Sequence, residues 1–189
     1  MSDPNTTPST RFPEIPRDRM TDAQKQAYDA IVAGPRGGAR GPFNALLRSP
    51  ELMDKVQRVG EYVRFKSVIP ARLNELAILV NARVWGSKFE FYAHRILALK
   101  AGLAESIADA VARNERPKGM QPDEELVYDF CTTLHRDRFV SDALFGRAVA
   151  AFSEQGVIDL IGVTGYYTMV SMVLNVADVP LPPGEKSPW

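Results

Sequence analysis

The chain has one cysteine, Cys131, and two histidines among its 189 residues. One cysteine excludes an intramolecular disulfide framework and suits a reducing compartment, so we expect a cytoplasmic protein. Two histidines without a His-x-x-x-His pair or another cluster of ligand residues do not form a zinc motif, so we expect no metal site. The chain has no excess of either charge, since 23 basic side chains balance 23 acidic ones, and it has no polybasic block. We therefore expect no nucleic-acid partner.

Long uninterrupted apolar runs are absent as well. Residues 1–12 lack the cationic start and apolar run of a secretory signal, and we expect them to form a flexible tail. The most apolar stretch, residues 157–179, is interrupted by Asp159, Asn175, Asp178 and several hydroxyl side chains. A membrane-spanning helix rarely holds so many polar groups. We expect a buried or interface helix there, and no membrane partner.

Residues 34–44 combine glycines and prolines, which disfavour regular structure. A phosphate-binding loop would need a lysine and a preceding strand, and neither is found here. We expect an irregular loop that serves as a mobile lid or a pocket wall.

Strand signals are nearly absent elsewhere, and helix signals dominate. Thr21 and Gln24 form a capping box that opens a helix ending near Gly34. Ser49-Pro50-Glu51 combines a cap, a first-turn proline and an acid favoured by the helix dipole, at the start of a helix that reaches about Lys66. Further helices are expected over about 70–84, 87–101, 103–113, 123–135, 141–153 and 155–176. The sequence predicts an all-α, single-domain helical bundle of about eight helices in residues 13–180, followed by a C-terminal tail over 181–189.

Proton-handling side chains stand inside this apolar helical pattern. Ser87, Glu90 and His94 have spacings of three, four and seven, which place them on one face of a helix. A carboxylate one turn before an imidazole can hydrogen-bond to it and favour its charged form, as a general acid or base requires. A second interpretation stays open, because Ser87-Lys88-Phe89-Glu90 is also an S-x-x-E capping box.

The spacing resembles a motif of the carboxymuconolactone decarboxylase superfamily, which includes the alkylhydroperoxidase D-like proteins. That motif is a glutamate, a Cys-x-x-Cys pair, a histidine and a Gly-Leu turn. Glu75 opens the pattern here, and Ser87 and Glu90 occupy the two cysteine positions twelve and fifteen residues later. His94 follows at nineteen, and Gly102-Leu103 matches the turn. Neither serine nor glutamate can form the redox disulfide, so dithiol chemistry is not expected.

The resemblance is specific over residues 70–112. It implies an alkylhydroperoxidase D-like helical fold assembled as a homo-oligomer, a dimer, trimer or hexamer, with a pocket between helices. With the cysteine pair absent, it implies acid–base chemistry in the style of the decarboxylase branch. The chain would be a cofactor-independent lyase or isomerase acting on a small, anionic carbonyl or lactone substrate. In that enzyme His94 would move the proton, Glu90 would position it or share the task, and Glu75 would support both.

Two other functions remain open. The chain could be a non-catalytic, oligomeric ligand-binding protein of the same fold. Alternatively, it could keep a peroxidase or redox activity typical of the family, although both redox cysteines are absent and Cys131 has no resolving partner.

Several other residues are candidates for contact with a substrate. Ser87 would bind substrate or cap its helix, and Tyr167 would join the site if the last helix covers it. Arginine can hold carboxylates through its planar fork, although for the two loop arginines we favour the interpretation as plain solvated charges. The remaining candidates are Phe43, Asn44 and Trp85 as substrate-binding residues, and Arg36, Arg40 and Arg83 as carboxylate holders.

Overall fold

The computed structural model describes residues 11–34 and 38–189. Within these ranges the chain contains eight α-helices and no strand. The predicted all-α, single-domain bundle of about eight helices is therefore confirmed. A 3-10 turn, Arg17–Arg19, precedes the first α-helix. The helices are α1 (Asp22–Ala33), α2 (Pro42–Leu46), α3 (Pro50–Phe65), α4 (Ala71–Val84), α5 (Lys88–Lys100), α6 (Glu105–Ala112), α7 (Pro122–Asp137) and α8 (Asp142–Ala177).

Local sequence signals explain where several helices begin. The predicted capping box forms at α1, where the Thr21 hydroxyl accepts a hydrogen bond from the Gln24 N–H and the Gln24 side chain accepts one from the Thr21 N–H. Pro50 and Pro122 are the first residues of α3 and α7, a position where a missing N–H breaks no helical hydrogen bond.

One segment differs from the sequence prediction. Residues 34–44 are predicted to be irregular, but Pro42–Leu46 forms the short helix α2. Gly41 makes this possible, because its φ of 61° turns the chain directly before Pro42. The two helices predicted over 141–153 and 155–176 are both present within α8, because the helix is broken at Ser153, where φ is 65° and ψ is 171°.

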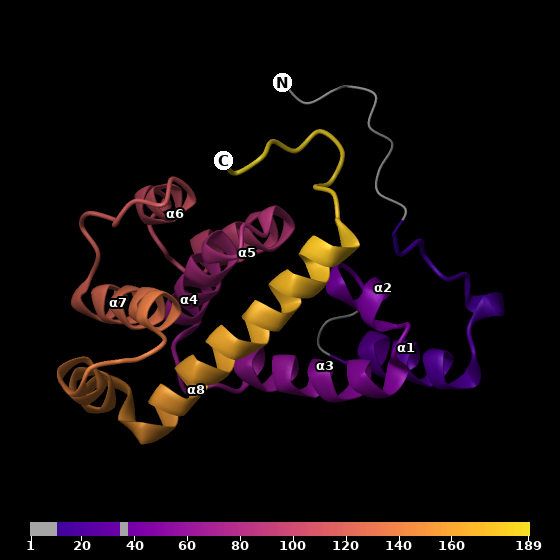
Figure 1. The fold of residues 1–189 in the computed structure, drawn as a ribbon, viewed down its shortest axis with the longest axis horizontal. Helices are drawn as coiled ribbons and strands as arrows, with labels where there is room; N and C mark the ends of the chain where they lie inside the picture. Colours follow the sequence, from indigo (N-terminus) through magenta and orange to yellow (C-terminus); the bar gives the residue numbers. More distant parts are fainter. Residues whose placement is uncertain (1–10, 35–37) are drawn as a thin grey trace.

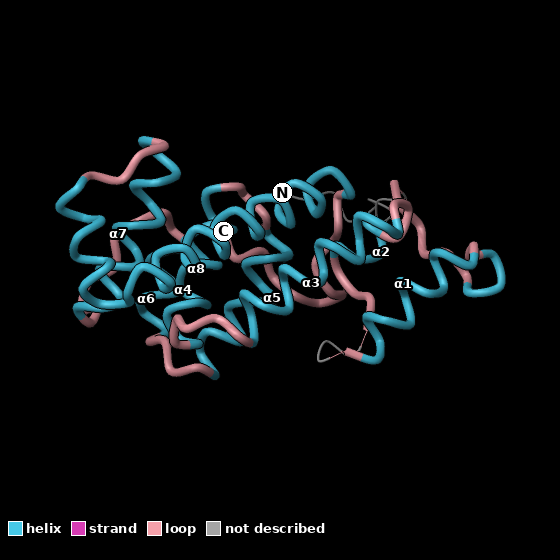
Figure 2. The backbone as a smooth tube through the Cα atoms, turned by 90° about the horizontal axis from the view of Figure 1, so that it is seen from below, coloured by secondary structure: helices cyan, strands magenta, loops and turns pink. Residues whose placement is uncertain are grey.

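The long helix α8 joins the two ends of the molecule. Its C-terminal part runs diagonally between α1–α3 on one side and α4–α7 on the other (Figure 1). It packs against α2, α3, α4, α5 and α7. A view from below shows an elongated molecule with α1 at one end and α6 and α7 at the other (Figure 2). Residues on α8 therefore face side chains from both halves of the chain.

Helix α8 is also long and apolar enough to cross a membrane, with a mean hydropathy of 1.6 in its most apolar window. Length and composition alone give this result, which is weak evidence, since the core helix of a folded domain meets the same test. In this structure 56% of that window is buried against the rest of the chain.

Two buried carboxylates connect distant helices. Asp159 on α8 accepts hydrogen bonds from the Tyr62 hydroxyl at 3.1 Å, the Ser67 hydroxyl at 2.8 Å and the Val68 N–H at 2.9 Å. It thereby fixes the connection between α3 and α4. Glu124 on α7 pairs with Arg72 on α4. Each carboxylate is satisfied by several donors or by a cation, as burial requires.

Both ends of the described chain contact the bundle. The Arg11 guanidinium donates to the Val176 carbonyl, so residues 11 and 12 of the predicted flexible tail lie on the fold, while residues 1–10 are outside the described part. The predicted C-terminal tail also packs, since the Trp189 ring meets the buried Phe91 edge-on, with ring centroids 5.3 Å apart.

Candidate functional site

Glu75, Glu90 and His94 form one buried cluster. His94 Nδ1 lies 2.6 Å from Glu75 Oε2 on α4, and His94 Nε2 lies 3.1 Å from Glu90 Oε1, one turn earlier on α5. The three residues are only 4–8% exposed. Helix α5 turns its buried face, Glu90, Phe91, His94 and Ala98, inward, and α4 packs beside it. The structure thus brings together the three residues that the sequence proposes as catalytic.

The two carboxylates favour a charged imidazole at His94. Burial by itself lowers the pKa of His94, because it disfavours the imidazolium. The charge of Glu90 and the hydrogen bonds to Glu75 and Glu90 outweigh burial and raise the pKa to about 9. At neutral pH His94 is therefore an imidazolium that donates its Nδ1–H to Glu75 and forms an ion pair with Glu90.

A cavity of about 250 Å³ opens beside this cluster. Glu90 and His94 line it, whereas Glu75 contacts His94 from α4 and does not line it. The other lining residues come from the segment before α2, the start of α2, the last turn of α3 and the middle of α8. They are Arg40, Gly41, Pro42, Phe43, Arg64, Tyr166, Tyr167 and Val170, and α5 adds Phe89 and Ala93.

Tyr167 on α8 packs directly against the imidazole of His94. The two rings meet edge-on at 4.9 Å between centroids, with an interplanar angle of 81°. Burial, followed by the charge of Glu90, raises the pKa of Tyr167 well above its ordinary value. The phenol therefore stays protonated and can donate a hydrogen bond.

Phe43 and Tyr167 are the two predicted substrate-binding residues that line this cavity. Asn44 instead donates its amide to the Phe12 carbonyl at 2.7 Å. The Trp85 indole donates to the Thr168 hydroxyl at 3.1 Å and ties the end of α4 to α8. These two residues have structural contacts and do not reach the His94 cavity.

Ser87 is also separate from the cavity. It precedes α5 and is almost fully buried, but its hydroxyl makes no capping hydrogen bond. It lines a different hollow of about 230 Å³ together with Lys88, Asn175 and Asp178. The capping box that would explain Ser87 and Glu90 without a substrate is therefore not formed, and Glu90 contacts His94 instead.

The predicted arginines differ in their surroundings. Arg40 lines the His94 cavity, and Arg83 donates to the Ala112 carbonyl while lying over the Trp189 ring. Arg36 is outside the described residues. Sequence reasoning missed Arg64, because only the docking of α3 beside α8 brings the last turn of α3 to this cavity. No local motif marks it.

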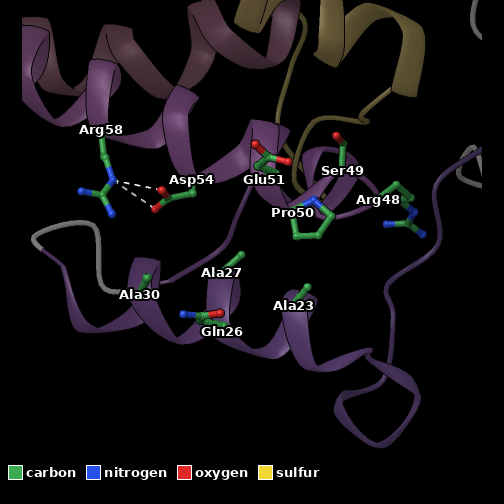
Figure 3. A pocket seen from close by; sticks show the side chains of 10 residues that line it. All are labelled: Ala23, Gln26, Ala27, Ala30, Arg48, Ser49, Pro50, Glu51, Asp54 and Arg58. Atoms are coloured by element: carbon green, nitrogen blue, oxygen red, sulfur yellow. Dashed lines mark hydrogen bonds and ion pairs between the residues drawn. The ribbon is translucent and has the colours of Figure 1, made fainter.

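A larger hollow of about 660 Å³ lies between α1 and α3. Figure 3 shows the side chains that line it, with small residues such as Ala23 and Ala30 on α1 and charged residues on α3. Arg58 pairs with Asp54 on the same helix, and Glu51 pairs with Lys55. None of its charged side chains is buried. This hollow therefore lacks the buried proton-handling groups of the smaller cavity.

The other residues able to ionise near neutral pH do not join this site. Cys131 is fully buried in α7, and burial raises its pKa to about 12. His135 is half-buried and its Nε2 lies 2.8 Å from Asn81 Oδ1. Within the described ranges, no group of three or more histidine, cysteine, aspartate or glutamate side chains is arranged to hold a metal ion.

Comparison with known proteins leaves the family resemblance as a prediction. No protein-family model matches the chain, and no curated protein matches it.

Proposed function

We propose that this protein is an acid–base enzyme, a lyase or isomerase that acts on a small carbonyl or lactone compound. One observation carries the proposal: His94 lies between two buried carboxylates, and one of these, Glu90, lines a cavity. A buried ionisable group whose pKa is shifted by charged neighbours beside a cavity, as the pKa of His94 is here, is typical of catalytic sites.

The geometry supports a different division of labour from the one that the sequence suggests. Both nitrogens of His94 already contact carboxylates, so the imidazolium has no free nitrogen with which to accept a proton. Glu90 lines the cavity and is a carboxylate, so we assign the base to Glu90. His94 would hold Glu90 in place and supply a proton beside it, and Glu75 would keep His94 charged.

The reaction would begin when Glu90 takes a proton from the carbon next to a carbonyl group. The electron pair of that C–H bond would move onto the carbonyl oxygen and form an enolate. In an isomerase the proton returns from Glu90 to another carbon of the same molecule. In a lyase that loses carbon dioxide, the electron pair comes instead from the broken carbon–carboxylate bond, and the proton delivered to that carbon comes from the His94–Glu90 pair.

An enolate needs a hydrogen-bond donor at its oxygen. Tyr167 lines the cavity and keeps its proton, so we assign this role to its hydroxyl.

A thiol peroxidase is disfavoured by the same geometry. Ser87 and Glu90 replace the cysteine pair, and the single thiol of Cys131 is buried with a pKa of about 12. At neutral pH almost none of this thiol is the reactive thiolate.

A non-catalytic ligand-binding protein is the second candidate. The occupation of both His94 nitrogens favours it, because an imidazolium fully engaged by Glu75 and Glu90 resembles a structural ion pair.

Solvent exchange at carbon tests the proposal with simple compounds in place of the physiological substrate. A panel of small ketones, keto acids and lactones is incubated with the protein in D₂O, and NMR follows loss of the proton next to the carbonyl group. We expect exchange of at least one compound, a loss of about 100-fold or more in Glu90→Gln, and little further loss in Glu90→Gln/His94→Gln. Glu105→Gln, which changes a glutamate paired with Arg95 away from the cavity, is the matched control.

Thermal unfolding of each variant shows whether the fold survives the change. Exchange that persists in Glu90→Gln would refute the assignment of the base. Binding of a panel compound without any exchange by the unmodified protein would favour the ligand-binding candidate.

A further inference from the structure

The cavity beside His94 contains two guanidinium groups that the proton-transfer scheme does not use. Arg64 comes from the last turn of α3, and Arg40 comes from the segment before α2. No described carboxylate forms an ion pair with either of them. The Arg64 guanidinium lies over the Phe65 ring, 5.0 Å from its centroid, which positions the charge without neutralising it.

This arrangement contrasts with the other arginine of α3. Arg58 pairs with Asp54 one turn away on the same helix. Arg64, two turns later, is half-buried at a cavity wall, where a bare guanidinium is more costly than at the surface. A half-buried cation without an anionic partner indicates that the partner is a ligand.

The charges around the cavity indicate the net charge of that ligand. Glu75 and Glu90 supply two negative charges, while His94, Arg40 and Arg64 supply three positive ones. The site therefore has a surplus of one cation. A monoanion would neutralise it, and a ligand with two negative charges would exceed it.

The remaining walls indicate the body of the ligand. Phe43, Phe89 and Val170 add apolar side chains to the lining of this cavity. The cavity volume of about 250 Å³ equals roughly eight water molecules at about 30 Å³ each. Such a space, lined by apolar side chains, suits a small compound with an apolar body.

We infer that Arg64 and Arg40 form a subsite for the carboxylate of a small monocarboxylate, whose apolar body lies against Phe43 and Phe89 and whose other end reaches Glu90. This inference names the substrate class of the proposed enzyme and shares its cavity, but the carboxylate subsite can be measured without turnover. Arg64 is the main anchor because it is half-buried, and Arg40 is the weaker one because it is exposed. The planar fork of arginine matches a carboxylate with two parallel hydrogen bonds.

Equilibrium binding of benzoate tests this subsite, with benzamide as a neutral compound of nearly the same shape and inorganic phosphate as another anion. Calorimetry or NMR titration at low ionic strength gives the dissociation constants. We expect benzoate to bind at millimolar concentrations or below and benzamide and phosphate to bind at least about tenfold more weakly. Arg64→Met should weaken benzoate binding about tenfold or more, Arg64→Lys should restore part of it, and Arg40→Met should have a smaller effect.

Arg58→Met is the matched control, since it removes a paired arginine from the same helix and should leave benzoate binding within about twofold of the unmodified protein. Glu90→Gln removes a negative charge from the cavity and should strengthen benzoate binding. This last variant separates the two proposals, because it abolishes proton exchange if Glu90 is the base and preserves the subsite in every case.

The inference would be overturned by no benzoate binding at millimolar concentrations, by equal binding of benzoate and benzamide, or by equal benzoate affinity in Arg64→Met and Arg58→Met. Thermal unfolding of both arginine variants establishes that the comparison is made on folded protein. Phosphate binding as tight as benzoate binding would likewise reject a site shaped for carboxylates.

Discussion

Raising the pH should deprotonate His94 and remove part of the stability of the fold. The pKa of His94 is about 9 in the folded chain and 6.5 in the absence of its surroundings. Because the folded state binds the proton more tightly, this contribution to stability is fully present below pH 6.5 and is lost as the pH rises through 9. At about 1.4 kcal/mol for each tenfold difference in proton affinity, the loss amounts to roughly 3 kcal/mol.

Urea unfolding between about pH 5.5 and about pH 9 measures this loss as a fall in the free energy of unfolding. Glu90→Gln keeps the shape of the side chain but removes one of the two carboxylates that raise the pKa of His94, so the fall should become smaller. Glu105→Gln removes an exposed glutamate and should leave it unchanged. The series stops at pH 9 because the buried Cys131 thiol, with its pKa raised to about 12, adds a further loss of stability above that pH.

NMR gives an independent test, because the chain has two histidines and His135→Gln assigns their ring signals. Burial lowers the pKa of His135, so its signals should titrate below those of His94. A His94 pKa at or below its ordinary value would show that burial outweighs the two carboxylates. An identical pH dependence of the free energy of unfolding in Glu90→Gln and the unmodified protein would show that Glu90 does not raise the pKa of His94.

Three further outcomes follow from the fold. Asp159→Asn removes a carboxylate that accepts three hydrogen bonds and should lower the free energy of unfolding by about 1–3 kcal/mol in urea. Gly41→Ala places a Cβ 3.1 Å from the Phe89 ring at a residue whose φ is 61°. This change should lower the free energy of unfolding by about 1–2 kcal/mol and weaken benzoate binding. Gly165→Ala, whose Cβ would lie in open space on α8, is the control and should do neither. The exposed apolar side chains along residues 157–176 should drive self-association, and light scattering that gives the 20.9 kDa of a single chain at micromolar concentrations would contradict this.

Much of the fold could be predicted from the sequence because the residues that determine a helix end lie within one turn of it. The Thr21–Gln24 capping box and the first-turn proline at Pro50 act within one turn, so their effect does not depend on the rest of the molecule. Helix α2 was harder to predict, because the glycines and prolines around Gly41 are typical of loops. Its formation depends on packing, since Phe43 and Leu46 are buried and α2 lies against α8.

The candidate site could likewise be predicted only in part from the sequence. Glu90 and His94 lie one turn apart on one helix, so their contact follows from helical spacing alone. Glu75 reaches them across two packed helices, and only the family resemblance suggested that pairing. Arg64 and Tyr166 join through the packing of α3 and α8, which brings together residues about one hundred positions apart in the sequence. No local pattern contains that information.

The ion cluster of Glu75, Glu90 and His94 supports a function because it is both buried and next to a cavity. A buried ion pair seldom stabilises a protein more than well-packed apolar residues would, so stability alone does not explain why Glu75, Glu90 and His94 are buried together. A purely structural cluster would have no need of a cavity. Here Glu90 and His94 line one, and Arg64, which also lines it, has no described carboxylate as partner. A site that binds an anion and moves a proton requires all three features: a charged pair, a cavity and an unneutralised cation.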